Sequence, residues 1–444
     1  MTDVSVSVVA MLDVSGSMWQ AMPMVIIDGK AFIRSARPAD QIAVVKFQSN
    51  ASMVYPANQA LVTVDGQMTV TAAAAAAIAT LTSGGSTDMG DAVNMAAAMM
   101  AGATNATKAY MLLSDGDWNV GPNPNTVMPA DVPVFICGLG SGMSQSYVSG
   151  MLSKNANSRY IASPNAYQMM QVFNSIRGLA AQAAVPTNVI QAYSGTDYSL
   201  TPVTIAGTSD EVQFSVVWSD ASISYTSGQP DANHVNLVLI DPSGHSTPYQ
   251  PVIADPGYAI FALNAPQTGV WQILTQYAVA NPLTGTHAGF EYDTVLHLDL
   301  KTPTMVSQGS GFTIRADLTD AGAPIENAAV SARVTRPQFE LPAMLARHRE
   351  AIARHQDANP DHSPHAALKA VLEQTAPGVE HFPYASTYVP LVQAEDGSYQ
   401  AEVGATETSG AYNVEVIAKG ASTKSKTIFS RTGRSTVLSE APET

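Results

Sequence analysis

Carboxylate and hydroxyl side chains recur at three places in the first 120 residues. The three segments are Asp13-Val14-Ser15-Gly16-Ser17, Gly84-Gly85-Ser86-Thr87-Asp88 and Ser114-Asp115-Gly116-Asp117. Oxygen atoms of these types are the ligands that hard cations such as Mg²⁺ prefer, six of them in an octahedron. The residue types therefore predict an oxygen-lined cation site, provided that the fold brings the three segments together.

The elements around these segments are predicted to do so. Predicted strands cover residues 4–12, 42–47, 109–113, 132–137 and 159–162, and predicted helices cover 18–36, 68–81, 88–100 and 167–184. This alternation is typical of a mostly parallel sheet with helices on both faces, so we predict a doubly wound, Rossmann-like α/β domain over residues 1–184. In such sheets, ligands bind outside the carboxyl ends of the strands, which is where the segments at Asp13 and Ser114 begin.

The three segments resemble the metal-ion-dependent adhesion site of von Willebrand factor A domains. That motif reads D-x-S-x-S, then a threonine after a glycine pair, then an aspartate in a T/S-D-G turn. The resemblance implies that the hydroxyls of Ser15 and Ser17 bind the cation directly, and Thr87 directly or through water. It implies that Asp13 and Asp115 act mainly through bound water and by orienting the hydroxyls.

One position departs from the family pattern. The family usually reads Gly-Gly-Thr, whereas Ser86 stands between the glycine pair and Thr87 in this sequence. Thr87 is favoured because an aspartate and a helix follow it directly, as in the family, and Ser86 remains the alternative.

The resemblance implies a binding function without catalysis. Neutral hydroxyl ligands leave the charge of Mg²⁺ (or Mn²⁺ or Ca²⁺) poorly compensated, so an open position would attract an Asp or Glu carboxylate of a protein partner. Trp19, Asp88 and Asp117 flank the ligands and are candidates for a partner-contact rim, although Asp88 and Asp117 also suit a solvated role. The resemblance thus implies a role in adhesion or assembly.

Three other interpretations are open. Ser17 and Thr87 stand where helix N-caps belong, so their hydroxyls could serve only as caps. The chain could be a self-assembling structural protein whose cation merely stabilises it. A metal-assisted hydrolase would need a general base, and the sequence offers none beside the two site acids.

The remainder of the chain is predicted to be β-rich. Short apolar runs separated by Pro and Gly turns predict an antiparallel β-sandwich over residues 185–300, similar to the one that follows the A domain in calcium-activated chloride channel regulators. Residues 301–434 look like an immunoglobulin-like or fibronectin-like β-sandwich with a helical insertion at about 338–383 that carries His348 and His355. Residues 435–444 are predicted to be a frayed tail.

The composition limits the partners. The net charge is −15, and residues 184–300 contain 10 acids and no Lys or Arg, so nucleic-acid binding is not expected. Cys137 is the only cysteine, which leaves no partner for a disulfide within the chain. No signal peptide or membrane span is visible, so we expect a cytoplasmic protein, or an extracellular one if a leader has been removed. Homo-oligomers are compatible with the sequence.

Overall fold

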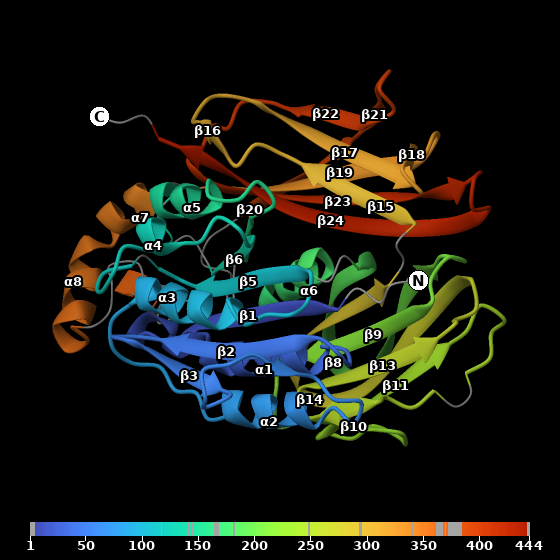
Figure 1. Cartoon of the computed structure of the whole chain (residues 1–444), viewed down its shortest axis with the longest axis horizontal. Helices are drawn as coiled ribbons and strands as arrows, with labels where there is room; N and C mark the ends of the chain where they lie inside the picture. Colours follow the sequence, from blue (N-terminus) through green and yellow to red (C-terminus); the bar gives the residue numbers. More distant parts are fainter. Residues whose placement is uncertain are drawn as a thin grey trace.

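The computed structural model contains an α/β domain followed by two β-rich domains (Figure 1). It describes the chain except for residues 1–4, 117, 140–142, 144, 164–167, 181–182, 247–248, 293–294, 339–340, 361–366, 369, 372–383 and 442–444. Within the described residues, no helix is long and apolar enough to cross a membrane.

The α/β domain is built on one sheet with the order β3-β2-β1-β5-β6-β7, with β4 beside β2. Its strands are β1 (Val6–Asp13), β2 (Gln41–Phe47), β3 (Ala51–Tyr55), β4 (Val62–Thr63), β5 (Thr107–Ser114), β6 (Val134–Leu139) and β7 (Arg159–Ser163). Strands β2, β1, β5, β6 and β7 run parallel, while β3 and β4 are antiparallel to β2. The predicted doubly wound α/β fold is confirmed.

Helices cover both faces of this sheet, which explains why every residue of β1 is buried. They are a short 3₁₀ helix, η1 (Gly16–Gln20), and α1 (Met22–Arg34), α2 (Thr69–Ile78), α3 (Met89–Met100), α4 (Pro124–Val127), α5 (Gln145–Leu152) and α6 (Met169–Ala180). Because side chains alternate along a strand, Ala10 and Leu12 pack with α1, α2 and α6, whereas Val9 and Met11 pack with α3 and α5.

The second domain is a single seven-stranded sheet bent around one apolar core. Its strands are β8 (Ala184–Ile205), β9 (Glu211–Trp218), β10 (Ser224–Thr226), β11 (His234–Ile240), β12 (Ile253–Asp255), β13 (Tyr258–Asn264) and β14 (Gly269–Glu291). The first part of β14 pairs with β11 and its last part pairs with β9, while β8 follows β14 along nearly its whole length. The sequence predicts a sandwich of two separate sheets in this domain. The long strands β8 and β14 instead connect the two layers into one continuous sheet.

The third domain is a sandwich of two five-stranded sheets around a common core. One sheet contains β15 (Leu296–Lys301), β17 (Phe312–Asp320), β18 (Ala323–Pro324), β21 (Val392–Gln393) and β22 (Tyr399–Val403). The other contains β16 (Met305–Ser307), β19 (Ala329–Pro337), β20 (Tyr384–Pro390), β23 (Gly410–Ser422) and β24 (Thr427–Glu440). The predicted frayed tail from 435 is wrong as far as residue 440, because Val437 and Leu438 are buried in β24.

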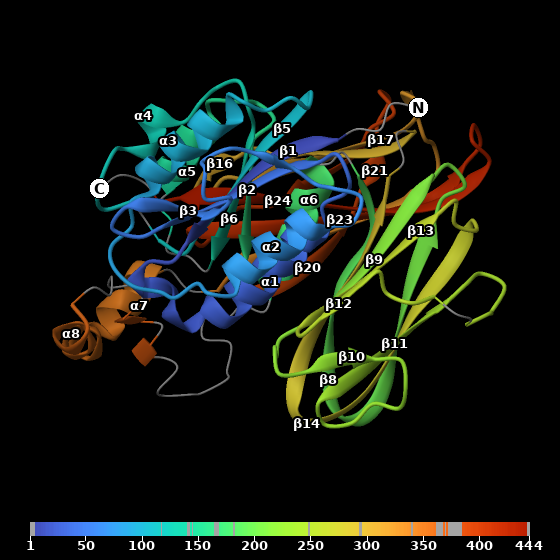
Figure 2. The ribbon, with the colours of Figure 1, turned by 60° about the horizontal axis from the view of Figure 1, so that its bottom comes forward.

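The helical insertion leaves and re-enters the third domain at adjacent points, since Pro337 and Tyr384 are partners in the β19–β20 ladder. It contains α7 (Leu341–Arg347) and α8 (Arg349–Ala358), with His348 at the break between them. The two helices lie at the end of the molecule opposite the second domain (Figures 1 and 2). Part of the predicted helix at 366–373 lies outside the described residues.

A buried histidine is expected to make the second domain sensitive to acid. His287 is fully buried, with Nδ1 2.7 Å from the Thr201 hydroxyl oxygen and Nε2 beside the Tyr193 hydroxyl. Burial lowers the pKa of His287 from 6.5 to about 3. Between these two pH values the unfolded imidazole takes up a proton and the folded one does not, so the unfolded state gains relative stability as the pH falls.

We therefore expect the free energy of unfolding to drop by about 2 kcal/mol between pH 6.5 and pH 5 through this group alone. Urea unfolding of the wild type and His287→Gln at several pH values measures this decrease, because the variant should lack the part of the pH dependence that comes from His287. His234→Gln, which changes a partly exposed histidine of the same domain, is the control. Equal pH slopes in wild type and His287→Gln would contradict the prediction.

Candidate metal site

The three polar segments meet at one edge of the α/β sheet. Asp13 is the last residue of β1, and Asp115 directly follows β5, the parallel neighbour of β1, so both lie at the carboxyl edge. The segment Gly84-Gly85-Ser86-Thr87-Asp88, here called the glycine loop, is held at this edge by two backbone hydrogen bonds. Gly16 donates to the Gly85 carbonyl (2.9 Å), and Gly84 donates to the Val14 carbonyl (2.8 Å). The convergence predicted from the sequence is thus present in the fold.

Hydroxyls and carboxylates at this edge form one hydrogen-bonded network. The Ser17 hydroxyl donates to Asp115 Oδ1 (2.7 Å), and the hydroxyl oxygens of Ser15 and Ser17 lie 3.1 Å apart. Asp13 accepts from the Ser15 backbone N–H (2.8 Å) and from the Ser114 hydroxyl (2.6 Å). Four of the five predicted ligands therefore lie in direct or near-direct contact.

Burial concentrates negative charge in this network. Asp13 is fully buried, and the loss of water together with the nearby Asp115 carboxylate raises the pKa of Asp13 to about 7. The hydrogen bonds from Ser114 and Ser15 act in the opposite direction, since they stabilise the ionised form. A cation between the two carboxylates would offset their repulsion.

The donor set fits a hard divalent cation. Two carboxylates and several hydroxyls offer oxygen atoms only, which suits Mg²⁺, Mn²⁺ or Ca²⁺ better than a metal that prefers thiolate or imidazole. Among the described residues, no group of three or more His, Cys, Asp and Glu side chains is placed to hold a metal. The hydroxyls of Ser15 and Ser17 would therefore have to complete the site, and their roles as ligands remain a prediction.

Thr87 and Ser86 are held differently at the same edge. Thr87 is 5% exposed, and it exchanges two hydrogen bonds with Asn119, donating its N–H to Asn119 Oδ1 (2.8 Å) and accepting at its carbonyl from the Asn119 N–H (3.2 Å). Ser86 is half-buried, and its N–H donates to the Ser49 hydroxyl. These hydrogen bonds involve the backbone of both residues and not their hydroxyls, so the choice of Thr87 over Ser86 as the ligand stays a prediction.

We expect Thr87→Val to weaken Mg²⁺ binding about tenfold or more, because valine keeps the shape and removes the oxygen. Ser86→Ala is the matched variant and should bind Mg²⁺ as the wild type does. Isothermal titration with MgCl₂ compares the two. The reverse ranking would assign the ligand to Ser86.

Two helix caps differ from the sequence interpretation. Asp88, not Thr87, is the N-cap of α3, and its carboxylate accepts from the Asp91 N–H (3.0 Å). Ser15, not Ser17, stands at the N-cap position of η1, and its side chain makes no capping hydrogen bond. The hydroxyls of Ser17 and Thr87 are therefore not occupied as helix caps.

The predicted rim is only partly supported by the geometry. Trp19 lies in η1 beside the ligands and is 46% exposed, which suits partner contact. Asp88 is 6% exposed and turned toward α3, so its assignment to the rim is wrong. Burial raises the pKa of Asp88. Asp117 lies outside the described residues.

Three supporting residues were not assigned roles from the sequence. The Ser114 hydroxyl donates to Asp13 and lies 3.0 Å from the Gly116 carbonyl oxygen, so it orients the carboxylate. Asn119 and Ser49 fix the glycine loop. The role of Ser114 could have been recognised from the sequence, because Ser114 belongs to the Ser-Asp-Gly turn. Ser49 and Asn119 come close to the glycine loop only through the tertiary fold, so the sequence does not indicate their roles.

The absence of a side chain at Gly121 leaves room for the Asp88 carboxylate that caps α3. The φ of Gly121 is +77°, and a Cβ there would lie 2.1 Å from Asp88 Oδ1. Gly121→Ala is expected to lower the free energy of unfolding by about 1–3 kcal/mol, since alanine is strained at this φ and would push the carboxylate out of its cap. Urea unfolding measures the loss against Gly66→Ala, a change at a position with open space. Equal stability of the two variants would contradict this account.

A family model matches part of the N-terminal domain. The family model described as von Willebrand factor type A domain matches residues 8–117. None of the curated proteins compared with this sequence matches it.

Several solved structures are similar to parts of the chain. A von Willebrand factor type A protein from Catenulispora acidiphila is 17% identical, with 72% of this chain and 64% of that chain covered and a TM-score of 0.37. Proximal thread matrix protein 1 from the mussel byssus is 19% identical, with 43% and 50% covered and a TM-score of 0.33. One form of that matrix protein is described with a zinc-occupied MIDAS motif. The PilB minor pilin from Streptococcus sanguinis is 13% identical, with 41% and 62% covered and a TM-score of 0.31.

The chain spans less than two thirds of the length of each of these structures. The match over residues 8–117 includes every residue of the candidate site from Asp13 to Asp115. The N-terminal α/β domain of this chain is a von Willebrand factor type A domain.

Proposed function

We propose that this protein is a divalent-cation-dependent binding protein that captures a carboxylate of a protein partner at the edge formed by Asp13, Ser15, Ser17, Thr87 and Asp115. The observation that carries the proposal is the network at that edge, in which the Ser17 hydroxyl is held by Asp115 and the Ser15 hydroxyl oxygen lies 3.1 Å from that of Ser17. Hydroxyls and acids of neighbouring loops are thereby pre-positioned around one point.

Each residue has a distinct part in this proposal. Ser15 and Ser17 present neutral oxygens to the cation, and Asp115 keeps the Ser17 hydroxyl oriented. Asp13 is fixed by Ser15 and Ser114 and supplies buried negative charge. A bound Mg²⁺ would supply an open coordination position for an oxygen of the partner's Asp or Glu. Trp19, which is 46% exposed, would contact the partner beside this position.

The same geometry argues against catalysis. A hydrolase would need a base free to take a proton from water. Both site acids already accept hydrogen bonds from hydroxyls, Asp115 from Ser17 and Asp13 from Ser114. We therefore propose that the site binds and does not hydrolyse, and a panel of ester and phosphoester substrates with Mg²⁺ or Mn²⁺ tests this part.

The central test is affinity purification of the full chain followed by mass spectrometry. Wild type in Mg²⁺, wild type in EDTA and Asp115→Ala in Mg²⁺ are compared, with Asp131→Ala as control because Asp131 is an exposed acid of the same domain. Partners are expected with wild type and Asp131→Ala in Mg²⁺ only. Recovery of the same partners under all four conditions would rule out the cation site as the recognition site.

A self-assembling protein would behave differently in solution. Its oligomers would persist in EDTA and disappear when residues 338–383 are removed. This excision is practical because Pro337 and Tyr384 are adjacent in the β19–β20 ladder and can be joined by a short turn. Light scattering of the excised and intact chains in EDTA distinguishes the two functions.

A further inference from the structure

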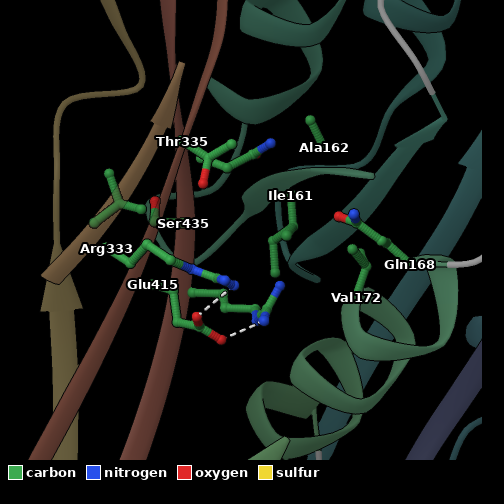
Figure 3. Close-up of a pocket in the computed structure, with 11 residues that line it drawn as sticks. Ile161, Ala162, Gln168, Val172, Arg333, Thr335, Glu415 and Ser435 are labelled. Carbon is green, nitrogen blue, oxygen red and sulfur yellow. Dashed lines mark hydrogen bonds and ion pairs between the residues drawn. The ribbon is translucent and has the colours of Figure 1, made fainter. Parts of the chain in front are cut away.

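Three charged side chains form a ladder across the sheet of the third domain that faces the von Willebrand factor type A domain. Arg333 on β19 is the cross-strand partner of Glu415 on β23, and Glu415 is the partner of Arg434 on β24. Glu415 Oε2 lies 2.7 Å from Arg333 Nη2, and Glu415 Oε1 accepts from Arg434 Nη2. Figure 3 shows Arg333 and Glu415 converging in a pocket between the domains.

This ladder carries more positive than negative charge. Two guanidinium groups share one carboxylate, which leaves a surplus of one positive charge at neutral pH. The side chains of Arg434 and Glu415 are only 11% and 12% exposed, whereas Arg333 is 38% exposed and forms the outer rim. Among the described residues that line the pocket, Glu415 is the only acid.

Among the described residues, the opposite wall of the pocket adds no charged side chain. It is formed by Ile161, Ala162, Gln168 and Val172 of the von Willebrand factor type A domain. Figure 3 shows Gln168 and Val172 facing the charged ladder from the α6 side. Arg434 Nε is buried and has no hydrogen-bond partner among the described residues. Burial, reinforced by the charge of Arg333, lowers the pKa of Arg434, as expected for a cation that lacks sufficient counter-charge.

We propose that this pocket is a binding site for a monatomic anion of the halide class, chloride in the cell, held by Arg333 and Arg434 between the first and third domains. A charge that is partly removed from water is costly unless it is paired, and these two arginines have one carboxylate between them. The pocket volume is about 30 Å³, which accommodates one or two water molecules or one ion of similar size. A monatomic ion therefore fits this space more closely than a tetrahedral oxyanion such as sulfate, which carries four oxygen atoms around its centre.

The anion would hold two domains together. One wall of the pocket belongs to β7 and α6 of the first domain and the other to β19, β23 and β24 of the third. A second contact nearby joins the same elements, since the Ala162 N–H donates to the Thr436 hydroxyl (2.9 Å). An anion that binds only the docked arrangement stabilises that arrangement by mass action.

The test measures the melting temperature of the full chain in the sodium salts of chloride, bromide, sulfate and gluconate at equal ionic strength. EDTA is present in every sample. In chloride and bromide the wild type is expected to melt about 2 °C or more higher than in gluconate. Sulfate stabilises folded proteins in general by exclusion from their surface, so it is expected to raise the melting temperatures of the wild type and Arg333→Gln equally. Arg333→Gln leaves Arg434 and Glu415 as a neutral pair, so it should fold and lose the halide effect. Arg336→Gln keeps the effect, because Arg336 lies on the same strand but pairs with the exposed Glu407 at 3.4 Å.

Crystals soaked in sodium bromide give a direct second readout. An anomalous peak between Arg333 and Arg434 in the wild type, absent in Arg333→Gln, is the expected result. The proposal is overturned if the halide effect is the same in wild type and Arg333→Gln, or if no bromide peak lies within contact distance of Arg434.

Discussion

Glu291→Gln is expected to lower the free energy of unfolding by about 3–5 kcal/mol, because it leaves the charge of Arg431 buried without its counter-ion. Glu291 at the end of β14 and Arg431 in β24 are 0% and 2% exposed, and Glu291 Oε2 lies 2.6 Å from Arg431 Nη1. The pair therefore joins the second and third domains in an environment from which water is excluded.

Further hydrogen bonds hold both partners in place. Glu291 Oε1 accepts from the Ala206 N–H (2.6 Å), and Arg431 donates to the Leu296 and Ser430 carbonyls (3.3 and 2.8 Å). Glutamine preserves the shape of Glu291 but not its charge. The decrease in the free energy of unfolding therefore reflects mainly the cost of leaving the Arg431 guanidinium buried without a counter-ion. The double variant Glu291→Gln with Arg431→Met should lose less than Glu291→Gln alone, since the buried charge is then gone.

Urea unfolding followed by tryptophan fluorescence measures this prediction. Glu407→Gln is the matched control, because Glu407 is 75% exposed in its pair with Arg336 and should cost well under 1 kcal/mol. If Glu291→Gln and Glu407→Gln unfold at the same urea concentration, the buried pair is not a major contributor to stability.

The sequence predicted the α/β domain well because its signals are local. Continuous apolar runs become buried parallel strands, and β1 ends at Asp13, where the motif begins. The approach of Ser17 to Asp115 could also be expected, since parallel neighbouring strands end at the same edge. The Asp88 cap was missed because the helix was predicted to begin at Asp88, whereas α3 begins at Met89 and leaves Asp88 in the N-cap position that aspartate favours.

Contacts between domains could not be predicted, because they depend on how whole domains dock. Arg431 reads as a surface residue near the end of the chain, yet its salt bridge to Glu291 connects strands about 140 positions apart in a buried interface. Arg333 and Glu415 alternate with apolar residues on their strands, and Arg434 stands in a polar stretch, so all three resemble an ordinary solvated face. Only the packing of β7 and α6 against that face turns it into a pocket.

The second large effect is expected at the cation site itself, where Asp13→Asn should weaken Mg²⁺ binding about 100-fold. Asp13 is fully buried and accepts from both the Ser15 N–H and the Ser114 hydroxyl. An asparagine amide can accept at one oxygen only and would turn its NH₂ group toward the other donor. The loop that carries Ser15 and Ser17 would lose its anchor, and the site would lose one negative charge.

Calorimetric titration with MgCl₂ measures the loss, and Asp131→Asn controls for the change of net charge in the same domain. Ser114→Ala separates anchoring from charge, because it removes one hydrogen bond to Asp13 and leaves the carboxylate in place. It should weaken Mg²⁺ binding less than Asp13→Asn does. Wild-type affinity in Asp13→Asn would mean that the cation binds elsewhere, and the proposed capture of a partner carboxylate at this edge would then lose its basis.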